Sequence, residues 1–277
     1  MYLNLKELLK KYKGETGIGA FNLHCMEMFP YIVKGAQKTN SPVIIQTSKA
    51  TAEYIGLDWL VSTAKLYSRQ IDLCLHLDHC TDIGFIKKAI NAGYSSVMYD
   101  GSYLSYEENV KNTIEVVNYA SKFNVSVEGE IGNIGGSEDG IAEKTNSIVY
   151  TKVEDAIDFV DRTNIDALAV AIGTVHGLYN GKAKINFGLL NELTDKLEDV
   201  GMVLHGGTGV SDEDFHKCAI KGMMKFNVGT ELNKSYIDNI NKDFQSATPT
   251  TSLRKLLNNA NESIEKIVEH RTNIIKL

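Results

Sequence analysis

The stretch IDLCLHLDHC (71–80) begins as an apolar run and ends in an acid flanked by two imidazoles. An apolar run of this length is typical of a β-strand that is covered on both faces. Two His-Gly pairs, His176-Gly177 and His205-Gly206, also stand where apolar runs end. Three histidines at three strand ends can bind one metal ion only if those ends converge, so the fold and the chemistry are linked.

Short apolar runs recur along the chain at regular intervals, and helical patterns separate them. Besides 71–77, the predicted strands are GIGAFN (17–22), VIIQT (43–47), YSSVMY (94–99), VSVEGEI (125–131), DALAVAI (166–172), GMVLH (201–205) and MMKFNV (223–228). The predicted helices are 26–40, 52–69, 82–92, 106–121, 153–163, 186–198, 212–221 and 231–244. Eight strands alternating with eight helices predict an α/β fold, a (β/α)8 TIM barrel whose C-terminal rim carries the functional residues. A doubly wound open sheet is the alternative, with a ligand at one topological switch point.

The chain has 277 residues, a length that suits one such barrel. We expect a single TIM-barrel domain over 1–277, with a C-terminal helical extension at about 250–277. The formal net charge of −6 argues against a nucleic-acid surface, and no run is long enough for a membrane span. The first residues do not resemble a signal peptide, and the four cysteines lack paired spacing. These features predict a cytoplasmic protein without nucleic-acid or membrane partners.

The histidines that follow the third, sixth and seventh predicted strands are His79, His176 and His205. Together they would form an open three-imidazole site suited to Zn²⁺, with one position left for substrate. In an extended strand His79 would point away from Asp78. For both to act together, the strand must end at about Asp78. His76 shares the face of Asp78 but lies deeper, and we expect it to play a supporting role.

Two glycine-rich turns, GGTG (206–209) and NVGT (227–230), follow neighbouring strands and lead into helices. Their backbone amides and the helix N-termini favour anions, and this pair of loops is the usual phosphate site of a TIM barrel. The longest interruption is GNIGGSEDGIAEKTNSIVYT (132–151). A long loop on the catalytic side indicates a lid, and a solvated surface loop is the alternative.

Taken together, these motifs resemble the class II, metal-dependent ketose-bisphosphate aldolases, which include fructose-bisphosphate and tagatose-bisphosphate aldolases. The resemblance runs nearly from end to end of the chain. It is carried by GAFN (19–22), SPVIIQTS (41–48), HLDHC (76–80), YDGS (99–102), VEGEIGNIGGSEDG (127–140), AIGTVHGLY (171–179), LHGGTG (204–209) and FNVGTEL (226–232).

The resemblance implies a role for each matching residue. Zn²⁺ would be held by His79, His176 and His205, with an alternate ion position near Asp100 and Glu130. Asp78 would handle the proton of the C4 hydroxyl, and Glu138 on the loop would exchange the C3 proton. The residues implied to line the pocket for dihydroxyacetone phosphate are Asn22, Ser48, Gly177, Gly206, Gly207, Thr208, Asn227, Val228, Gly229 and Thr230.

The chain departs from the family pattern at three places. Many relatives have a lysine directly after the tyrosine of HGxY, whereas here Asn180 follows Tyr179 and the nearest lysine is Lys182. Position 229 is Gly where other relatives have Asn, Asp or Ala. Arg254 resembles an arginine that reaches the distal phosphate from a neighbouring subunit.

A barrel aldolase can stabilise the carbanion with a Schiff-base lysine or with a Lewis acid. No lysine stands at a predicted strand end, since Lys225 is in mid-strand, and the metal route is therefore favoured. The resemblance implies zinc-dependent cleavage of fructose 1,6-bisphosphate to dihydroxyacetone phosphate and glyceraldehyde 3-phosphate in glycolysis and gluconeogenesis, with a monovalent cation as a further cofactor. Tagatose 1,6-bisphosphate is the alternative substrate, a zinc-dependent hydrolase is a remote alternative, and a homodimer or homotetramer is implied.

Overall fold

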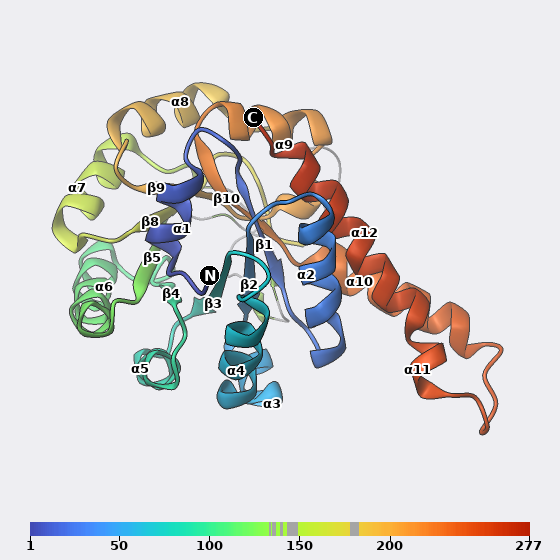
Figure 1. Ribbon diagram of the computed structural model, residues 1–277. Helices are drawn as coiled ribbons and strands as arrows, with labels where there is room; N and C mark the ends of the chain where they lie inside the picture. The colour runs from blue at the N-terminus through green and yellow to red at the C-terminus, as the bar shows by residue number, and fades with distance from the viewer. Residues whose placement is uncertain (133, 135–136, 139–140, 143–148, 178–182) are drawn as a thin grey trace.

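The computed structural model describes residues 1–277 except 133, 135–136, 139–140, 143–148 and 178–182. Parallel strands close into a barrel in the order β1-β10-β9-β8-β5-β4-β3-β2, and helices surround it (Figure 1). The strands are β1 (Ile18–Asn22), β2 (Val43–Thr47), β3 (Leu73–Cys80), β4 (Ser96–Tyr99), β5 (Ser126–Ile131), β8 (Ala167–Val170), β9 (Gly201–Leu204) and β10 (Met223–Val228). The predicted TIM barrel is confirmed, and the open doubly wound sheet is wrong.

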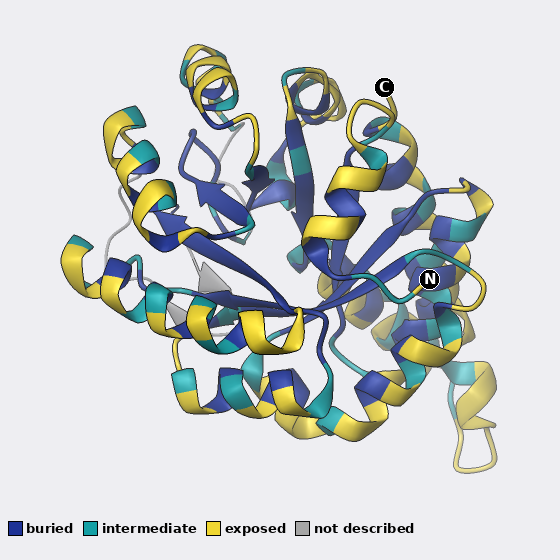
Figure 2. Ribbon diagram, turned by 60° about the vertical axis from the view of Figure 1, so that its left-hand side comes forward, coloured by how far each residue is buried: buried dark blue, intermediate teal, exposed yellow. Residues whose placement is uncertain are grey.

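Helices follow the strands as the apolar periodicity predicts. The helices that cover the barrel are α2 (Phe29–Lys38), α3 (Lys49–Ile55), α4 (Leu57–Tyr67), α5 (Ile83–Ala92), α6 (Tyr106–Ala120), α7 (Val153–Thr163), α8 (Phe187–Lys196), α9 (Asp212–Ile220) and α10 (Thr230–Phe244). Their buried faces pack on the strands and their outer faces are exposed (Figure 2). The predicted helix 52–69 is instead two helices, because Gly56 has φ +96° and breaks the chain between them.

The N-terminal end of the barrel is closed by α1 (Leu5–Tyr12). Asn4 and Glu7 form a capping box that fixes the start of this helix. Its buried leucines contact an apolar layer of inward-facing strand residues: Ile18, Ala20, Ile44, Cys74, Ala167, Ala169 and Val203. Burying each leucine contributes about 1.5–3 kcal/mol. The barrel interior near the N-terminal ends of the strands is therefore a packed apolar core. The polar part of the interior lies nearer the C-terminal ends of the strands.

The predicted C-terminal helices are present as α11 (Leu253–Leu256) and α12 (Asn258–Ile274). The long helix α12 packs against α2 and α10, whereas α11 stands out from the barrel on an arm (Figure 1). Among the residues that the structure describes, no helix is both long enough and apolar enough to cross a membrane.

Candidate active site

The three histidines that follow separate strands meet at the C-terminal mouth of the barrel. His79 lies near the end of β3, His176 follows β8, and His205 directly follows β9. Their candidate ligand atoms all lie within 4.8 Å of one another. The ring centroids are 4.5 Å apart for His79 and His205, 4.8 Å for His79 and His176, and 5.6 Å for His176 and His205. The barrel thus gathers side chains that are up to 126 residues apart in the sequence.

A backbone irregularity lets Asp78 and His79 share this mouth. The strand does not end at Asp78 as predicted, since β3 continues to Cys80. Instead, His79 has φ +45° and the register with β4 shifts between Leu77 and Cys80. A left-handed residue interrupts the alternation of side chains along the strand. The predicted strand end was wrong, and this kink takes its place.

Asp78 is 1% exposed and accepts hydrogen bonds from three amide side chains. Its Oδ2 accepts from Asn22 Nδ2 at 3.1 Å and from Gln46 Nε2 at 3.0 Å. Its Oδ1 accepts from Asn227 Nδ2 at 3.3 Å. These amide donors fix the carboxylate at the mouth, an arrangement suited to a group that exchanges protons with a substrate.

Buried carboxylates stand behind two of the histidines. Asp100 Oδ2 lies 2.9 Å from His79 Nδ1, and Glu128 Oε1 lies 2.9 Å from His205 Nε2. Glu130 Oε2 lies 3.3 Å from His205 Nδ1. His79, Asp100 and Glu130 also form a second group whose ligand atoms lie within 4.8 Å of one another. This group coincides with the alternate ion position that the family resemblance implies.

The buried imidazole and carboxylate groups of this site shift one another's pKa values. Burial lowers the pKa of His205, but the carboxylates of Glu128 and Glu130 beside its ring outweigh burial and raise that pKa to about 9. Burial and the charge of Asp100 raise the pKa of Glu130. Burial also raises the pKa of Asp100, but the hydrogen bond from His79 holds it well below its usual range. Carboxylates thus keep a positive charge on an imidazole, the charge that a metal ion would replace.

The donor set fits a catalytic metal ion. Three imidazole nitrogens with room for a fourth ligand are the ligand set of open Zn²⁺ sites. Carboxylates that hold the opposite ring nitrogens are the usual support of such ligands. Within the described part of the chain, both Glu130 oxygens and His205 Nδ1 are buried without a hydrogen-bond partner. Buried polar atoms of this kind are costly unless a further group contacts them.

The glycine-rich loops share a cavity with one of these histidines. The cavity is lined by His176, Gly177, Gly206, Gly207, Thr208, Asn227, Gly229 and Thr230. A Cβ atom at Gly207 would lie 2.5 Å from the Asn227 carbonyl oxygen, so only glycine lets the two loops approach. Thr208 Oγ1 also accepts a hydrogen bond from the backbone of Glu231 at 3.2 Å. Backbone amides and the N-terminus of α10 therefore border the candidate metal centre.

The remaining predicted site residues are placed less uniformly. Ser48 directly follows β2 and caps α3 by accepting from Thr51 N at 3.3 Å. The Val228 side chain packs in the hydrophobic core, so only its backbone can face a ligand. Glu138 lies in the short hairpin of β6 (Ser137–Glu138) and β7 (Ile141–Ala142), and its side chain is not described. Lys182 lies outside the described residues, as does much of the predicted lid. Arg254 is exposed on α11, the short helix that stands out from the barrel (Figure 1).

Three buried residues of the barrel interior were not predicted: Gln46, Glu128 and Lys225. Each is a polar residue at an inward-facing position of a strand that is buried in the barrel. That pattern is a usable signal, because a buried charge or amide in a barrel requires a partner. Gln46 contacts Asp78, and the other two contact each other.

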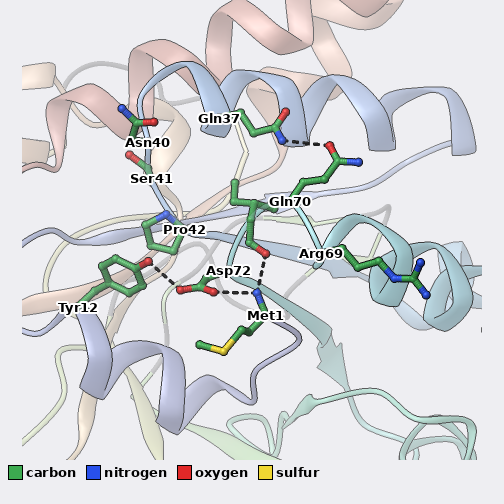
Figure 3. Close-up of a pocket in the computed structure, with 10 residues that line it drawn as sticks. Met1, Tyr12, Gln37, Asn40, Ser41, Pro42, Arg69, Gln70 and Asp72 are labelled. Atoms are coloured by element: carbon green, nitrogen blue, oxygen red, sulfur yellow. Dashed lines mark hydrogen bonds and ion pairs between the residues drawn. The ribbon is translucent and has the colours of Figure 1, made fainter.

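Another cavity, of about 590 Å³, lies at the opposite end of the barrel, beside α1 and the residues that precede β2 and β3 (Figure 3). Asp72 there accepts from the Met1 ammonium group and from Tyr12 Oη, each at 2.8 Å, and from Lys11. Burial raises the pKa of Asp72, but these donors outweigh it and lower that pKa to about 2. Neither candidate metal group lies at this end. We assign the chemistry to the C-terminal mouth.

The fold and the mouth of the barrel define a TIM-barrel protein with a trihistidine candidate metal centre beside two glycine-rich loops. Residues 3–277 match the family model described as "Fructose-bisphosphate aldolase class-II". The chain therefore belongs to the class II fructose-bisphosphate aldolase family, and it is a lyase of the aldolase type.

The proteins to which the chain is similar are named for different substrates. The chain is 41% identical to a fructose-bisphosphate aldolase of Ureaplasma parvum over 84% of this chain and 81% of that protein. It is 36% identical to a sulfofructosephosphate aldolase of Alkalicoccus urumqiensis (97% and 94% covered) and 34% identical to the D-tagatose-1,6-bisphosphate aldolase subunit GatY of Klebsiella oxytoca (94% and 92%). A crystal structure of a candidate fructose-1,6-bisphosphate aldolase from Coccidioides immitis superposes with a TM-score of 0.89 at 30% identity, covering 98% of this chain and 96% of that one.

Proposed function

We propose that this protein is a zinc-dependent aldolase that cleaves fructose 1,6-bisphosphate reversibly to dihydroxyacetone phosphate and glyceraldehyde 3-phosphate, as a single-domain enzyme over 1–277. The observation that carries the proposal is the convergence of three imidazoles on one point beside the glycine-rich loops. Family membership supports a metal-dependent aldol reaction, and the trihistidine donor set supports Zn²⁺. When bound, the ion supplies a Lewis acid that polarises the carbonyl next to the bond that breaks.

The residues of the chain supply binding and proton transfer. His79, His176 and His205 would hold the ion, and the loops at 206–209 and 227–230 would bind the phosphate of the dihydroxyacetone half through backbone amides. On cleavage, Asp78 would accept the C4 hydroxyl proton while the C3–C4 bond breaks and C4 becomes the aldehyde carbon. The electron pair of that bond stays on C3, which Glu138 would protonate. The fixed geometry of the Asp78 carboxylate supports its part in this sequence.

The other expected properties remain part of the proposal. Asn22 and Ser48, at the ends of β1 and β2, would contribute to the same pocket, and Lys182 and Arg254 would reach phosphate groups. A monovalent cation would assist phosphate binding, and Asp100 with Glu130 would offer an alternate ion position. The enzyme would act in the cytoplasm, in glycolysis and gluconeogenesis, as a homodimer or homotetramer.

The test combines metal analysis of purified protein with a coupled triose-phosphate assay. We expect about one zinc ion per chain and cleavage of fructose 1,6-bisphosphate with the higher kcat/KM in a side-by-side comparison with tagatose 1,6-bisphosphate. The alternative is a tagatose-bisphosphate aldolase with the same mechanism, which the relative from Klebsiella oxytoca supports. A sulfofructose phosphate belongs in the same comparison because of the relative from Alkalicoccus urumqiensis. Hydrolytic products without triose phosphates would favour the zinc-dependent hydrolase and refute the aldolase.

A further inference from the structure

An ionic layer crosses the barrel interior directly beneath the candidate metal centre. It consists of His76 from β3, Glu128 from β5 and Lys225 from β10, and all three side chains are fully buried. Lys225 Nζ lies 2.9 Å from Glu128 Oε2, and His76 Nε2 lies 3.5 Å from the same oxygen. His76 Nδ1 is in turn 2.8 Å from Ser96 Oγ. One carboxylate oxygen, Glu128 Oε2, therefore lies within 3.5 Å of two side-chain nitrogens.

Stability alone does not account for this layer. Removing a carboxylate and an ammonium group from water carries a large desolvation cost. A well-packed apolar pair of the same volume would therefore often give the fold equal or greater stability. The layer below shows that this barrel can be filled with apolar side chains, since α1 and the inward-facing strand residues pack there. The ionic layer lies one step nearer the mouth, where Glu128 Oε1 lies 2.9 Å from His205 Nε2 of the candidate metal centre.

We infer that Glu128 is a positioning residue, held by Lys225, that fixes the tautomer of His205 so that this imidazole binds the metal through Nδ1. The inference rests on the proposed metal function. A neutral imidazole carries one N–H, and donating it from Nε2 to Glu128 places the lone pair on Nδ1. Nδ1 is the nitrogen on the side of the centre, because it lies 3.3 Å from Glu130 Oε2.

Lys225 determines which oxygen of Glu128 is left to accept a hydrogen bond from His205. Because the Lys225 ammonium group is paired with Oε2, the Oε1 oxygen remains for His205. In Glu128→Gln the single carbonyl oxygen would turn toward the Lys225 ammonium, which can only donate. The amide NH₂ would then face His205 Nε2 and force the proton onto Nδ1, where it blocks the metal. In the double variant Glu128→Gln/Lys225→Met, the carbonyl oxygen is released and can accept from His205 again.

The experiment measures Zn²⁺ affinity by competition with a chromophoric chelator, and the visible spectrum of the Co²⁺ form, for wild type, Glu128→Gln, Glu128→Gln/Lys225→Met and a control. We expect Glu128→Gln to bind Zn²⁺ about 10–100-fold more weakly and the double variant to recover most of that loss. The control is Thr163→Val on α7, which removes one buried hydrogen bond, from Thr163 Oγ1 to Phe159 O, far from the mouth. It should keep wild-type affinity and the wild-type Co²⁺ spectrum.

Each result is decisive. Wild-type affinity in Glu128→Gln, or no recovery in the double variant, overturns the inference while leaving the aldolase proposal intact. If the wild type itself binds no Zn²⁺, both fail together. A measurement on the wild type covers the case in which a variant does not fold: a crystal structure of the zinc-loaded protein should show His205 bound through Nδ1 and Glu128 within hydrogen-bond distance of Nε2. Coordination through Nε2 would refute the assignment.

Discussion

Replacing Asp78 with Asn tests the proton-transfer role while preserving the shape of a buried side chain. From amide side chains in the described part of the chain, Asp78 Oδ2 accepts two hydrogen bonds and Oδ1 accepts one, the longest of the three at 3.3 Å, from Asn227. An asparagine can keep the first two by placing its NH₂ group at the Oδ1 position. The variant then loses the hydrogen bond from Asn227, because the new NH₂ group faces the NH₂ group of Asn227. This should lower the folding stability by about 1–3 kcal/mol. This is smaller than the usual folding stability of about 5–15 kcal/mol, so Asp78→Asn should remain folded.

The expected loss of activity is larger than the loss of stability. An asparagine cannot accept the C4 hydroxyl proton, and general acid–base assistance is worth roughly 10²–10⁴-fold in rate, or about 3–5 kcal/mol of activation free energy. Asp78 belongs to neither candidate metal group, so the zinc content should not change. The coupled triose-phosphate assay gives kcat/KM, elemental analysis gives the zinc content, and urea unfolding gives the stability.

The matched control is Asp166→Asn, a carboxylate at the other end of the barrel. Asp166 Oδ2 accepts a hydrogen bond from Val127 N at 2.9 Å, and Oδ1 pairs with Lys6 at 3.0 Å. This control should lose stability without losing turnover. The reasoning is refuted if Asp78→Asn, fully loaded with zinc, turns over within about tenfold of wild type, since general acid–base assistance is worth more than that.

Three further predictions use other parts of the molecule. EDTA should abolish activity and Zn²⁺ should restore it, and borohydride with substrate should trap no adduct because Lys225 is buried in its ion pair; a trapped lysine adduct would point to Schiff-base chemistry. Gly206→Ala combines φ +65° with a Cβ atom 2.3 Å from the Val175 carbonyl oxygen, whereas Gly56→Ala has φ +96° and open space. For Gly56→Ala, backbone strain alone should lower the free energy of unfolding by at most roughly 1–3 kcal/mol. Gly206→Ala should lower it by more, because the clash adds to the strain. Equal losses of the two variants in urea unfolding would contradict the clash. The folded-state pKa of Asp72 is lowered to about 2 from its usual 3.8, so its contribution to stability is present above pH 3.8 and is lost as the pH falls toward 2. The stability difference between wild type and Asp72→Asn should therefore shrink on acidification, and a difference that grows would show the opposite sign.

Much of the fold followed from the sequence because parallel barrel strands are continuous apolar runs. Strand β10 has the predicted limits, and β3 was placed but shifted by two residues at its start. The break at Gly56 was missed because the apolar pattern of α3 continues into α4. A single glycine with positive φ interrupts the helix without interrupting that pattern.

The meeting of the histidines could be predicted because each follows its own strand, and strand ends share one rim. The supporting contacts could not be predicted, because they depend on register between strands that are distant in sequence. Gln46 reaches Asp78 from the neighbouring strand, and Glu128 reaches His205 across the barrel interior. Those pairings are a property of the closed sheet, and no spacing along the chain encodes them.

At His79, the positive φ that brings the imidazole to the mouth of the barrel also lowers the stability of the fold. In the described part of the chain, the other non-glycine residues with positive φ are asparagines, at positions 40, 124 and 164. Asparagine tolerates that backbone better than histidine, which bears a penalty of roughly 1–2 kcal/mol. The metal-free His79→Asn protein should melt no lower than metal-free wild type, and a lower melting temperature would contradict this. If a duplicated gene were no longer selected for activity, asparagine could replace His79 without loss of folding stability. The product would be a folded barrel without aldolase activity.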